Sequence, residues 1–291
     1  MSLANQVGIV SRAQVNIPTP GAETGTGTIV QKTLNPDGSS TYYALTAKHV
    51  VRDPGSGRQM AGEEPGENIS IPKYVITQSG AFPIQSMYRD PSGKDLALFS
   101  FTVPPGGKPL TVAKVSSSGG ADLSGKPIVL VGGAPEASTR PELVAEGANL
   151  KPNGGLCSYT APVNLPAKPL ESDASSPSDL PPGLVSFPSK TLPTEPGTSG
   201  SAYVGPSGIA GVHYAVSSQT EGGPDKGRTY VTPVDSRWVT AGVTALESGT
   251  GPDVRHLDPP PNAANIVGTY YKKYDLPRAG KSPEAVCWTP S

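Results

Sequence analysis

The chain has 291 residues and a formal net charge of −1, with 23 lysines and arginines against 24 aspartates and glutamates. This near-neutral balance excludes an electrostatic case for nucleic acid or an anionic membrane as a partner. Glycine (35 residues) and proline (34 residues) together occur at about twice their usual frequency, which argues against long helices and indicates a loop-rich chain.

Cysteine content and the opening residues narrow the class of protein further. Two cysteines, Cys157 and Cys287, are too few for a disulfide framework, and the sequence leaves open whether they pair with each other. Residues 1–15 contain no apolar run long enough for a signal peptide. No stretch approaches the roughly 20 apolar residues that span a bilayer. We therefore expect a soluble protein that acts inside a cell or is cut from a longer precursor.

The N-terminal half is predicted to consist of β-strands. Residues 25–51 contain two short runs rich in Thr, Val, Tyr and Ile around an Asn-Pro-Asp-Gly turn, which is typical of a β-hairpin. Further alternating or apolar runs lie at residues 67–76 and 95–103. His49 follows the second run of the hairpin, and Asp95 opens the run at 95–103.

The C-terminal half contains a second group of strand-like runs, at residues 125–135, 143–150, 199–204, 208–216 and 228–234. Turn signals recur roughly every ten residues, which suits a β-barrel or sandwich. The only helix that we expect is at 234–246, with Asp235 or Ser236 as its N-cap. Residues 162–196 are predicted to be a Pro/Ser-rich loop, and residues 249–291 a Pro-rich tail.

Glu195–Val204 holds a Gly-x-Ser-Gly core that runs from Gly197 to Gly200. A serine hydroxyl is a poor nucleophile at neutral pH, so it needs a base, an orienting partner and N–H donors for the developing oxyanion. The glycines permit a tight turn that aims the N–H groups of Gly197 and Ser199 into one hollow. Taken alone, however, such a motif is more often an ordinary turn.

The positions of His49 and Asp95 favour the catalytic interpretation. Taken singly, His49 could be a surface residue at a strand end and Asp95 a turn cap. A carboxylate that opens a buried strand is costly unless it is paired. All three contexts, in the order His49, Asp95, Ser199, occur in one all-β chain. Asp90 is a rival to Asp95, but no apolar strand follows it directly, and we expect Asp90 and Glu195 to be solvated.

Three short motifs resemble those of chymotrypsin-like serine proteases, the two-barrel family: Thr-Ala-x-His at 46–49, Asp-Leu-Ala at 95–97 and Gly-x-Ser-Gly at 197–200. The resemblance covers residues 20–247. It implies an all-β fold of two six-stranded Greek-key β-barrels, with a short C-terminal helix and a Pro-rich tail. The sequence departs from the family at Ala202, where proline is common.

The resemblance also assigns domains and roles. Residues 1–120 would form the barrel that carries His49 and Asp95, residues 121–248 the barrel that carries Ser199, and residues 249–291 a Pro-rich extension. His49 would be the general base, Asp95 its orienting partner and Ser199 the nucleophile. The N–H groups of Gly197 and Ser199 would form the oxyanion hole.

A substrate pocket is implied by Thr194, His213 and Ala215. In family members that cleave after glutamate or glutamine, a threonine and a histidine at similar offsets from the nucleophile line the pocket. Their N–H and hydroxyl groups can bind a side-chain carbonyl or carboxylate and would reject an aliphatic side chain. Ala215 stands where relatives tend to have glycine, and an inward Glu195 would favour Gln or a basic residue over Glu. Alternatively, His213 is a core residue of a strand.

We therefore predict a serine endopeptidase that forms an acyl-enzyme on Ser199 and uses no cofactor. No metal site is expected, because the cysteines lie far apart in the sequence. Within the family, the sequence most resembles bacterial glutamyl endopeptidases and viral polyprotein-processing proteases. If the protein is viral, we expect it in host cytoplasm or in a virion. Its partners would be a polypeptide substrate, including its own polyprotein or capsid subunits. The alternatives are a capsid or virion structural protein on this fold and a secreted bacterial serine protease.

Overall fold

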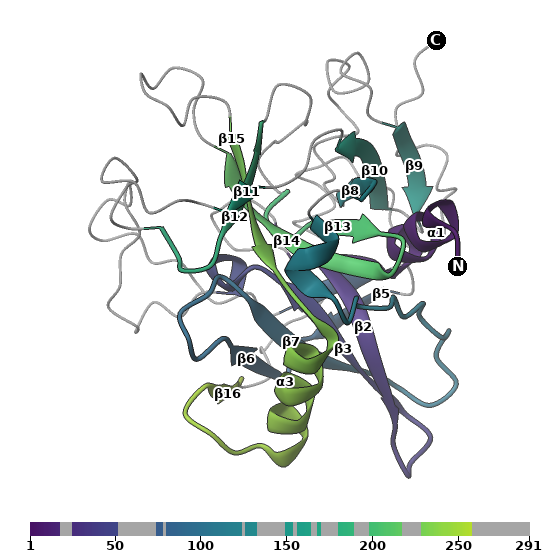
Figure 1. Cartoon of the computed structure of the whole chain (residues 1–291). Coiled ribbons are helices and arrows are strands. Elements are labelled where there is room, and N and C mark those ends of the chain that lie inside the picture. Colours follow the sequence, from purple (N-terminus) through teal and green to yellow (C-terminus); the bar gives the residue numbers. More distant parts are fainter. Residues whose placement is uncertain are drawn as a thin grey trace, which may run out of the picture.

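The computed structural model in Figure 1 shows a mostly β protein with two curled sheets. The structure describes residues 1–17, 25–51, 74–77, 80–123, 126–132, 149–153, 156–163, 168–169, 180–188, 198–216 and 228–257. Within these ranges each sheet has eight strands, and neighbouring strands run antiparallel. The all-β, two-barrel fold predicted from the sequence is confirmed, although each sheet has eight strands where six were expected.

The first sheet has the strand order β16-β6-β7-β3-β2-β1-β4-β5. Its strands are β1 (Gln14–Ile17), β2 (Gly25–Leu34), β3 (Ser40–Thr46), β4 (Tyr74–Thr77), β5 (Gly80–Pro83), β6 (Ser86–Arg89), β7 (Ala97–Val103) and β16 (Val254–His256). The predicted hairpin is confirmed: β2 pairs with β3, and Leu34 lies opposite Ser40 across the turn. The additional strand β16 comes from the predicted tail, pairs with β6 and forms one edge of the sheet.

The second sheet has the strand order β11-β12-β15-β14-β13-β8-β10-β9. Its strands are β8 (Ile128–Gly132), β9 (Asn149–Asn153), β10 (Leu156–Val163), β11 (Lys168–Pro169), β12 (Val185–Pro188), β13 (Ala202–Gly205), β14 (Gly208–Val216) and β15 (Arg228–Pro233). The prediction of a continuous loop at 162–196 is wrong, because β10 reaches Val163, and β11 and β12 lie within it. Prolines are tolerated near a sheet edge, and β12 pairs with β15 despite its terminal Pro188.

One helix was missed by the sequence analysis. α1 (Leu3–Ala13) begins after Ser2, whose hydroxyl accepts a hydrogen bond from the Asn5 N–H at 3.3 Å. Its buried residues Gln6, Val10 and Ala13 recur at helical spacing. The helix packs on β8 and β13 of the second sheet, although the strand that follows it in the chain, β1, belongs to the first sheet. Tertiary packing therefore stabilises a segment whose β-branched residues and Gly8 favour helix only weakly.

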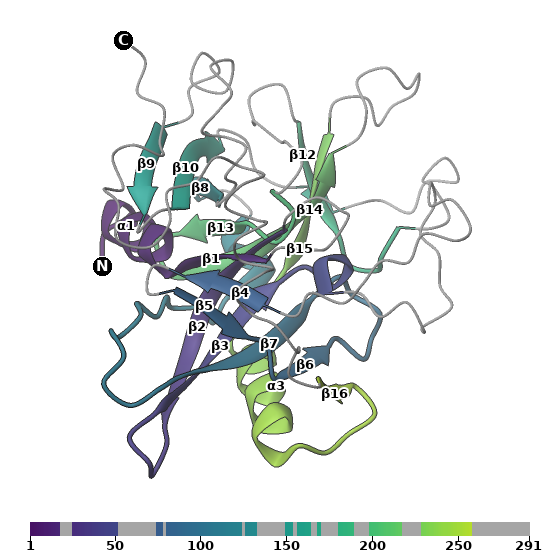
Figure 2. The ribbon, with the colours of Figure 1, turned by 180° about the vertical axis from the view of Figure 1, so that it is seen from behind.

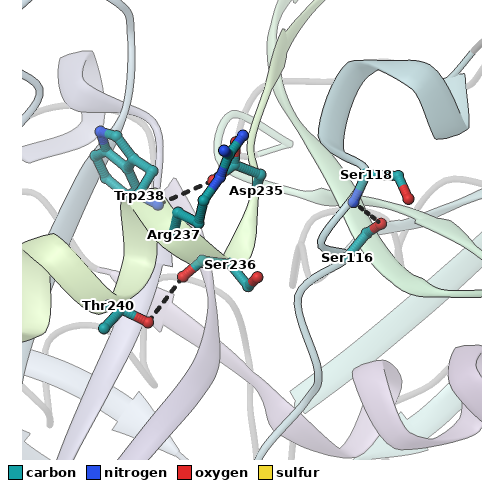
Figure 3. Close-up of polar contacts among 7 residues, drawn as sticks. All are labelled: Ser116, Ser118, Asp235, Ser236, Arg237, Trp238 and Thr240. Carbon is teal, nitrogen blue, oxygen red and sulfur yellow. Dashed lines mark hydrogen bonds and ion pairs between the residues drawn. The ribbon is translucent and has the colours of Figure 1, made fainter.

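The predicted C-terminal helix is confirmed as α3 (Ser236–Ser248). Its N-cap is Asp235, whose carboxylate accepts a hydrogen bond from the Trp238 N–H at 3.0 Å (Figure 3). The helix ends at Gly249 with a left-handed φ of 64°. It packs on β6 and β7 of the first sheet, as both views show (Figures 1 and 2).

An apolar cluster of described residues joins the two sheets. Phe99 and Leu45 from the first sheet belong to the same buried cluster as Val131 and Val204 from the second. The predicted division near residue 120 stays a prediction; the 3₁₀ helix η3 (Gly119–Leu123) lies there, between β7 and β8. No helix among the described residues is both long and apolar enough to cross a membrane.

Candidate active site

His49 and Asp95 lie against each other at the first sheet. His49 belongs to the 3₁₀ helix η1 (Lys48–Val51), which directly follows β3. The His49 Nδ1 atom lies 2.8 Å from Asp95 Oδ2, and the His49 backbone N–H donates to Asp95 Oδ1 at 2.9 Å. The carboxylate is buried and the imidazole is partly exposed. A carboxylate that holds both the backbone and the ring of a histidine fixes the orientation of the imidazole and favours the tautomer protonated at Nδ1.

Asp90 organises the turn that presents Asp95, so the expectation that Asp90 is solvated is wrong. Its side chain is buried because four donors satisfy it. Oδ1 accepts hydrogen bonds from the Ser92 N–H and hydroxyl and from the Lys94 N–H, and Oδ2 accepts one from the Trp238 indole N–H. Asp90 therefore acts as a structural carboxylate and does not replace Asp95 beside His49.

Ser199 occupies a tight turn that is seated on β2. The Ser201 N–H donates to the Thr198 carbonyl at 2.9 Å, and Gly200 has a φ of 88°, a conformation that glycine adopts most readily. The Ser199 carbonyl accepts a hydrogen bond from the Thr26 N–H at 2.8 Å. A Cβ at position 200 would collide with the Thr26 carbonyl oxygen. The glycine after the serine is therefore required both by its φ and by this close approach.

The second sheet reaches His49 through β14. The Tyr214 ring meets the His49 ring edge to face, with a centroid distance of 5.5 Å. The neighbouring residue His213 connects to the serine turn through its backbone: its carbonyl accepts from the Gly200 N–H, and its N–H donates to the Ser201 carbonyl. One short segment of β14 thus contacts both the histidine and the serine turn.

Other predicted site residues are described only in part. Gly197, Thr194 and Glu195 lie outside the described residues. Ala215 pairs with Tyr230 through the backbone in β14 and β15. Cys157 lies in β10, and Cys287 is outside the described ranges.

His213 is buried in the second sheet and bonded to a tyrosine. Its Nδ1 lies 3.1 Å from the Tyr203 hydroxyl. Burial, followed by repulsion from His49, lowers the pKa of His213 from 6.5 to about 3, and Asp95 opposes this shift. The ring is therefore neutral at physiological pH. Tyr203 was not predicted as a site residue; its pairing with Gly211 places it diagonally across from His213.

This buried histidine should make the protein sensitive to acid. The unfolded chain binds a proton at His213 with an ordinary pKa of about 6.5, whereas the folded chain does so only near pH 3. Between these values the unfolded state binds more protons, so the free energy of unfolding should fall as the pH is lowered. Urea unfolding at several pH values should show that the free energy of unfolding of His213→Gln declines less steeply with falling pH than that of the wild type. Equal slopes for the two proteins would contradict the assignment.

A metal centre has no support within the ranges that the structure describes, since they hold no group of three or more His, Cys, Asp or Glu side chains suited to an ion.

Comparison with protein families agrees with this architecture. The family model for the trypsin-like peptidase domain matches residues 25–212, which include the described strands β2 to β13 and the residues His49, Asp95 and Ser199. The chain belongs to this family. It is a chymotrypsin-like serine peptidase.

Similarity to individual proteins is low. Among solved structures, the scabies mite inactivated protease paralogue S-D1 is 15% identical, covering 86% of this chain and 97% of that one, with a TM-score of 0.49. Deg5 is 15% identical, covering 84% and 92%, with a TM-score of 0.47. The thermostable serine protease AL20 from an extremophilic microorganism is 12% identical, covering 82% and 99%, with a TM-score of 0.46. No curated protein gives a significant match.

Proposed function

We propose that His49, Asp95 and Ser199 are the catalytic triad of this peptidase. The observation that carries the proposal is the double hydrogen bond between His49 and Asp95, which leaves Nε2 as the basic nitrogen of the imidazole. Nε2 takes the Ser199 hydroxyl proton as Oγ attacks the scissile carbonyl. It then returns the proton to the leaving amine, and water hydrolyses the acyl-enzyme by the same route. The N–H groups of Gly197 and Ser199 stabilise the oxyanion.

A fluorophosphonate probe tests the nucleophile directly. The probe labels an activated serine covalently, so mass spectrometry of the labelled peptide identifies the residue. Label on Ser199 supports the triad, and label that does not depend on Ser199 refutes it. The alternative of an inactive structural protein on this fold requires that no serine reacts.

The substrate pocket is proposed to select glutamine, and secondarily glutamate, before the scissile bond. His213, Thr194 and Ala215 would line it. When the Tyr203 hydroxyl donates to Nδ1, the hydrogen of the neutral His213 ring lies on Nε2 and can be donated to a side-chain carbonyl. The low pKa of His213 means that the pocket base carries no positive charge. Desolvating a glutamate carboxylate there is costly, whereas a neutral amide pays a much smaller penalty that a hydrogen bond to the ring offsets.

A peptide library that varies the residue before the scissile bond should therefore show cleavage mainly after Gln, with Glu second. The preference for Gln over Glu should persist from pH 6 to pH 8, since the pKa of His213 lies near 3. Tyr203→Phe is the matched variant, because it removes only the hydroxyl that holds the ring. It should weaken discrimination of Gln from aliphatic residues by about tenfold, the cost of one buried hydrogen bond. Cleavage mainly after Arg, Lys or large aromatic residues would contradict the pocket.

The natural substrate is proposed to be a viral polyprotein, with the enzyme acting in host cytoplasm or a virion. The support is the resemblance of the three motifs to those of processing proteases and the shortage of cysteines for the disulfides of the vertebrate branch. Expression within a longer precursor would test it. Release of the peptidase from the wild-type precursor, and its retention in the Ser199→Ala precursor, is the expected result.

A further inference from the structure

A hydrogen bond connects the C-terminal helix to the turn that carries Asp95. The Trp238 indole N–H of α3 donates to Asp90 Oδ2 at 2.7 Å, although the two residues are 148 positions apart. Neither residue contacts His49 among the described interactions. The Asp90 carboxylate is buried, so loss of this hydrogen bond would leave a buried acceptor without its donor, which is costly in free energy.

Asp90 determines the shape of the turn from β6 to β7. Its Oδ1 accepts hydrogen bonds from the Ser92 N–H at 2.8 Å and from the Lys94 N–H at 3.1 Å. The Asp90 N–H in turn donates to the Leu96 carbonyl, and the Leu96 N–H donates to the Lys94 carbonyl. The last bond closes a three-residue turn with Asp95 at its centre. The Asp90 carboxylate thus fixes the residues immediately before and around Asp95.

Trp238 is held in place by the N-cap of its own helix and by close packing on the first sheet. The Trp238 backbone N–H donates to the side chain of the cap residue Asp235 (Figure 3). The first helical residue, Ser236, donates its N–H to the Ser116 carbonyl at 2.9 Å. The centroid of the Trp238 ring lies 5.7 Å from the centroid of the Tyr88 ring of β6. At Gly242 a Cβ would lie 2.6 Å from Leu98, so the helix can approach the first sheet this closely only with glycine at that position.

We propose that Trp238 and Asp90 are positioning residues for the reaction. They hold Asp95 against His49, and they couple this pair to the segment that follows β15 of the second sheet. The proposal rests on the proposed triad, because positioning matters for catalysis only if His49 and Asp95 act there. Removing the Trp238–Asp90 bond should let the Asp95 turn move while leaving substrate contacts intact.

Trp238→Phe tests the proposal, because it keeps an aromatic ring on Tyr88 and deletes the indole donor. Two readouts separate positioning from simple stability. The first is the low-field NMR resonance of the proton between His49 Nδ1 and Asp95, measured in a Ser199→Ala background to prevent self-cleavage. It should shift, broaden and exchange faster with solvent. The second is the kinetic split: kcat should fall about tenfold with KM nearly unchanged, as expected for loss of a hydrogen bond to a charged group.

Glu247→Ala is the matched control. Glu247 ties the other end of α3 to the first sheet, through the Thr33 hydroxyl at 2.8 Å and the Tyr43 hydroxyl at 3.2 Å. The substitution Glu247→Ala therefore loosens the same helix far from the Asp95 turn. It should leave the resonance and kcat unchanged. If Glu247→Ala produced the same changes as Trp238→Phe, the effect would be general loosening of the helix and the proposal would be wrong.

Asp90→Asn gives an independent variant should Trp238→Phe fold poorly. An asparagine can still accept from Ser92 and Lys94, but its amide NH₂ then faces the indole donor. It should move the same resonance, and the double variant should be no worse than the more severe single variant. Folded Trp238→Phe or Asp90→Asn protein with an unchanged resonance and kcat overturns the proposal. The resonance needs no turnover, so a failure of the Ser199 assignment would be recognised separately.

Discussion

Ser199→Ala is expected to abolish both covalent labelling by fluorophosphonate and peptide cleavage. The alanine removes the only atom that can form the acyl-enzyme, and losses on the order of 10⁶-fold in kcat are typical when a serine nucleophile is deleted. The fold should survive, because the hydrogen bonds of the turn involve the backbone of Thr198, Ser199, Gly200 and Ser201. Active-site labelling and progress curves with a Gln-containing peptide measure the effect.

The matched control for this experiment is Ser248→Ala. Ser248 is an exposed serine at the end of α3, where its hydroxyl donates to the Ala245 carbonyl. It should label and cleave like the wild type. A Ser199→Ala protein that still cleaves at a rate near that of the wild type would remove Ser199 from the mechanism, whatever the geometry of His49 and Asp95.

Asp95→Asn is expected to lower kcat on the order of 10⁴-fold, the size of the effect in the well-studied triad with this substitution. The geometry gives the reason. The His49 backbone N–H donates to Asp95 Oδ1, and the side-chain oxygen of an asparagine can still accept this hydrogen bond. The asparagine NH₂ then faces His49 Nδ1, where Oδ2 stood. It donates to that nitrogen and drives the ring proton onto Nε2, so the base is already protonated where it must accept.

Steady-state kinetics would measure the fall in kcat, and NMR would detect which nitrogen of His49 carries the proton. KM should change little, because the Asp95 carboxylate is buried and bonded to His49, and a buried side chain is not available to bind the substrate. A loss in kcat of less than about tenfold would show that Asp95 does not control the tautomer of the base.

Local patterns predicted much of the fold. The hairpin β2–β3, strand β7 and helix α3 are each specified by residues that are neighbours in sequence: a turn signal, an apolar run and a capping aspartate. α1 was missed because its helical spacing includes a buried glutamine, Gln6, and because its stability comes from packing on the second sheet. β12 was missed because it lies in a stretch rich in proline and serine that resembles a loop, and only pairing with β15 makes it a strand.

The candidate site shows the same division. The motifs around His49, Asp95 and Ser199 are short and could be recognised singly, and the offset of His213 from Ser199 was visible. The supporting contacts could not be recognised in this way. The bond between Asp90 and Trp238 joins residues 148 positions apart, and the Tyr214 ring reaches His49 from the other sheet. Such contacts exist only after both halves of the chain have packed together.

The exchange of chain ends between the two halves bears on how a protease survives its own activity. α1 precedes the first sheet but packs mainly on the second, whereas α3 and β16 follow the second sheet and pack on the first. Neither half can therefore open without releasing an end that belongs to the other. Unfolding of such an arrangement is cooperative, and partly open states are rare. Among the described residues, this arrangement leaves few transiently exposed segments for another copy to cut, so we expect cleavage within these elements to follow global unfolding.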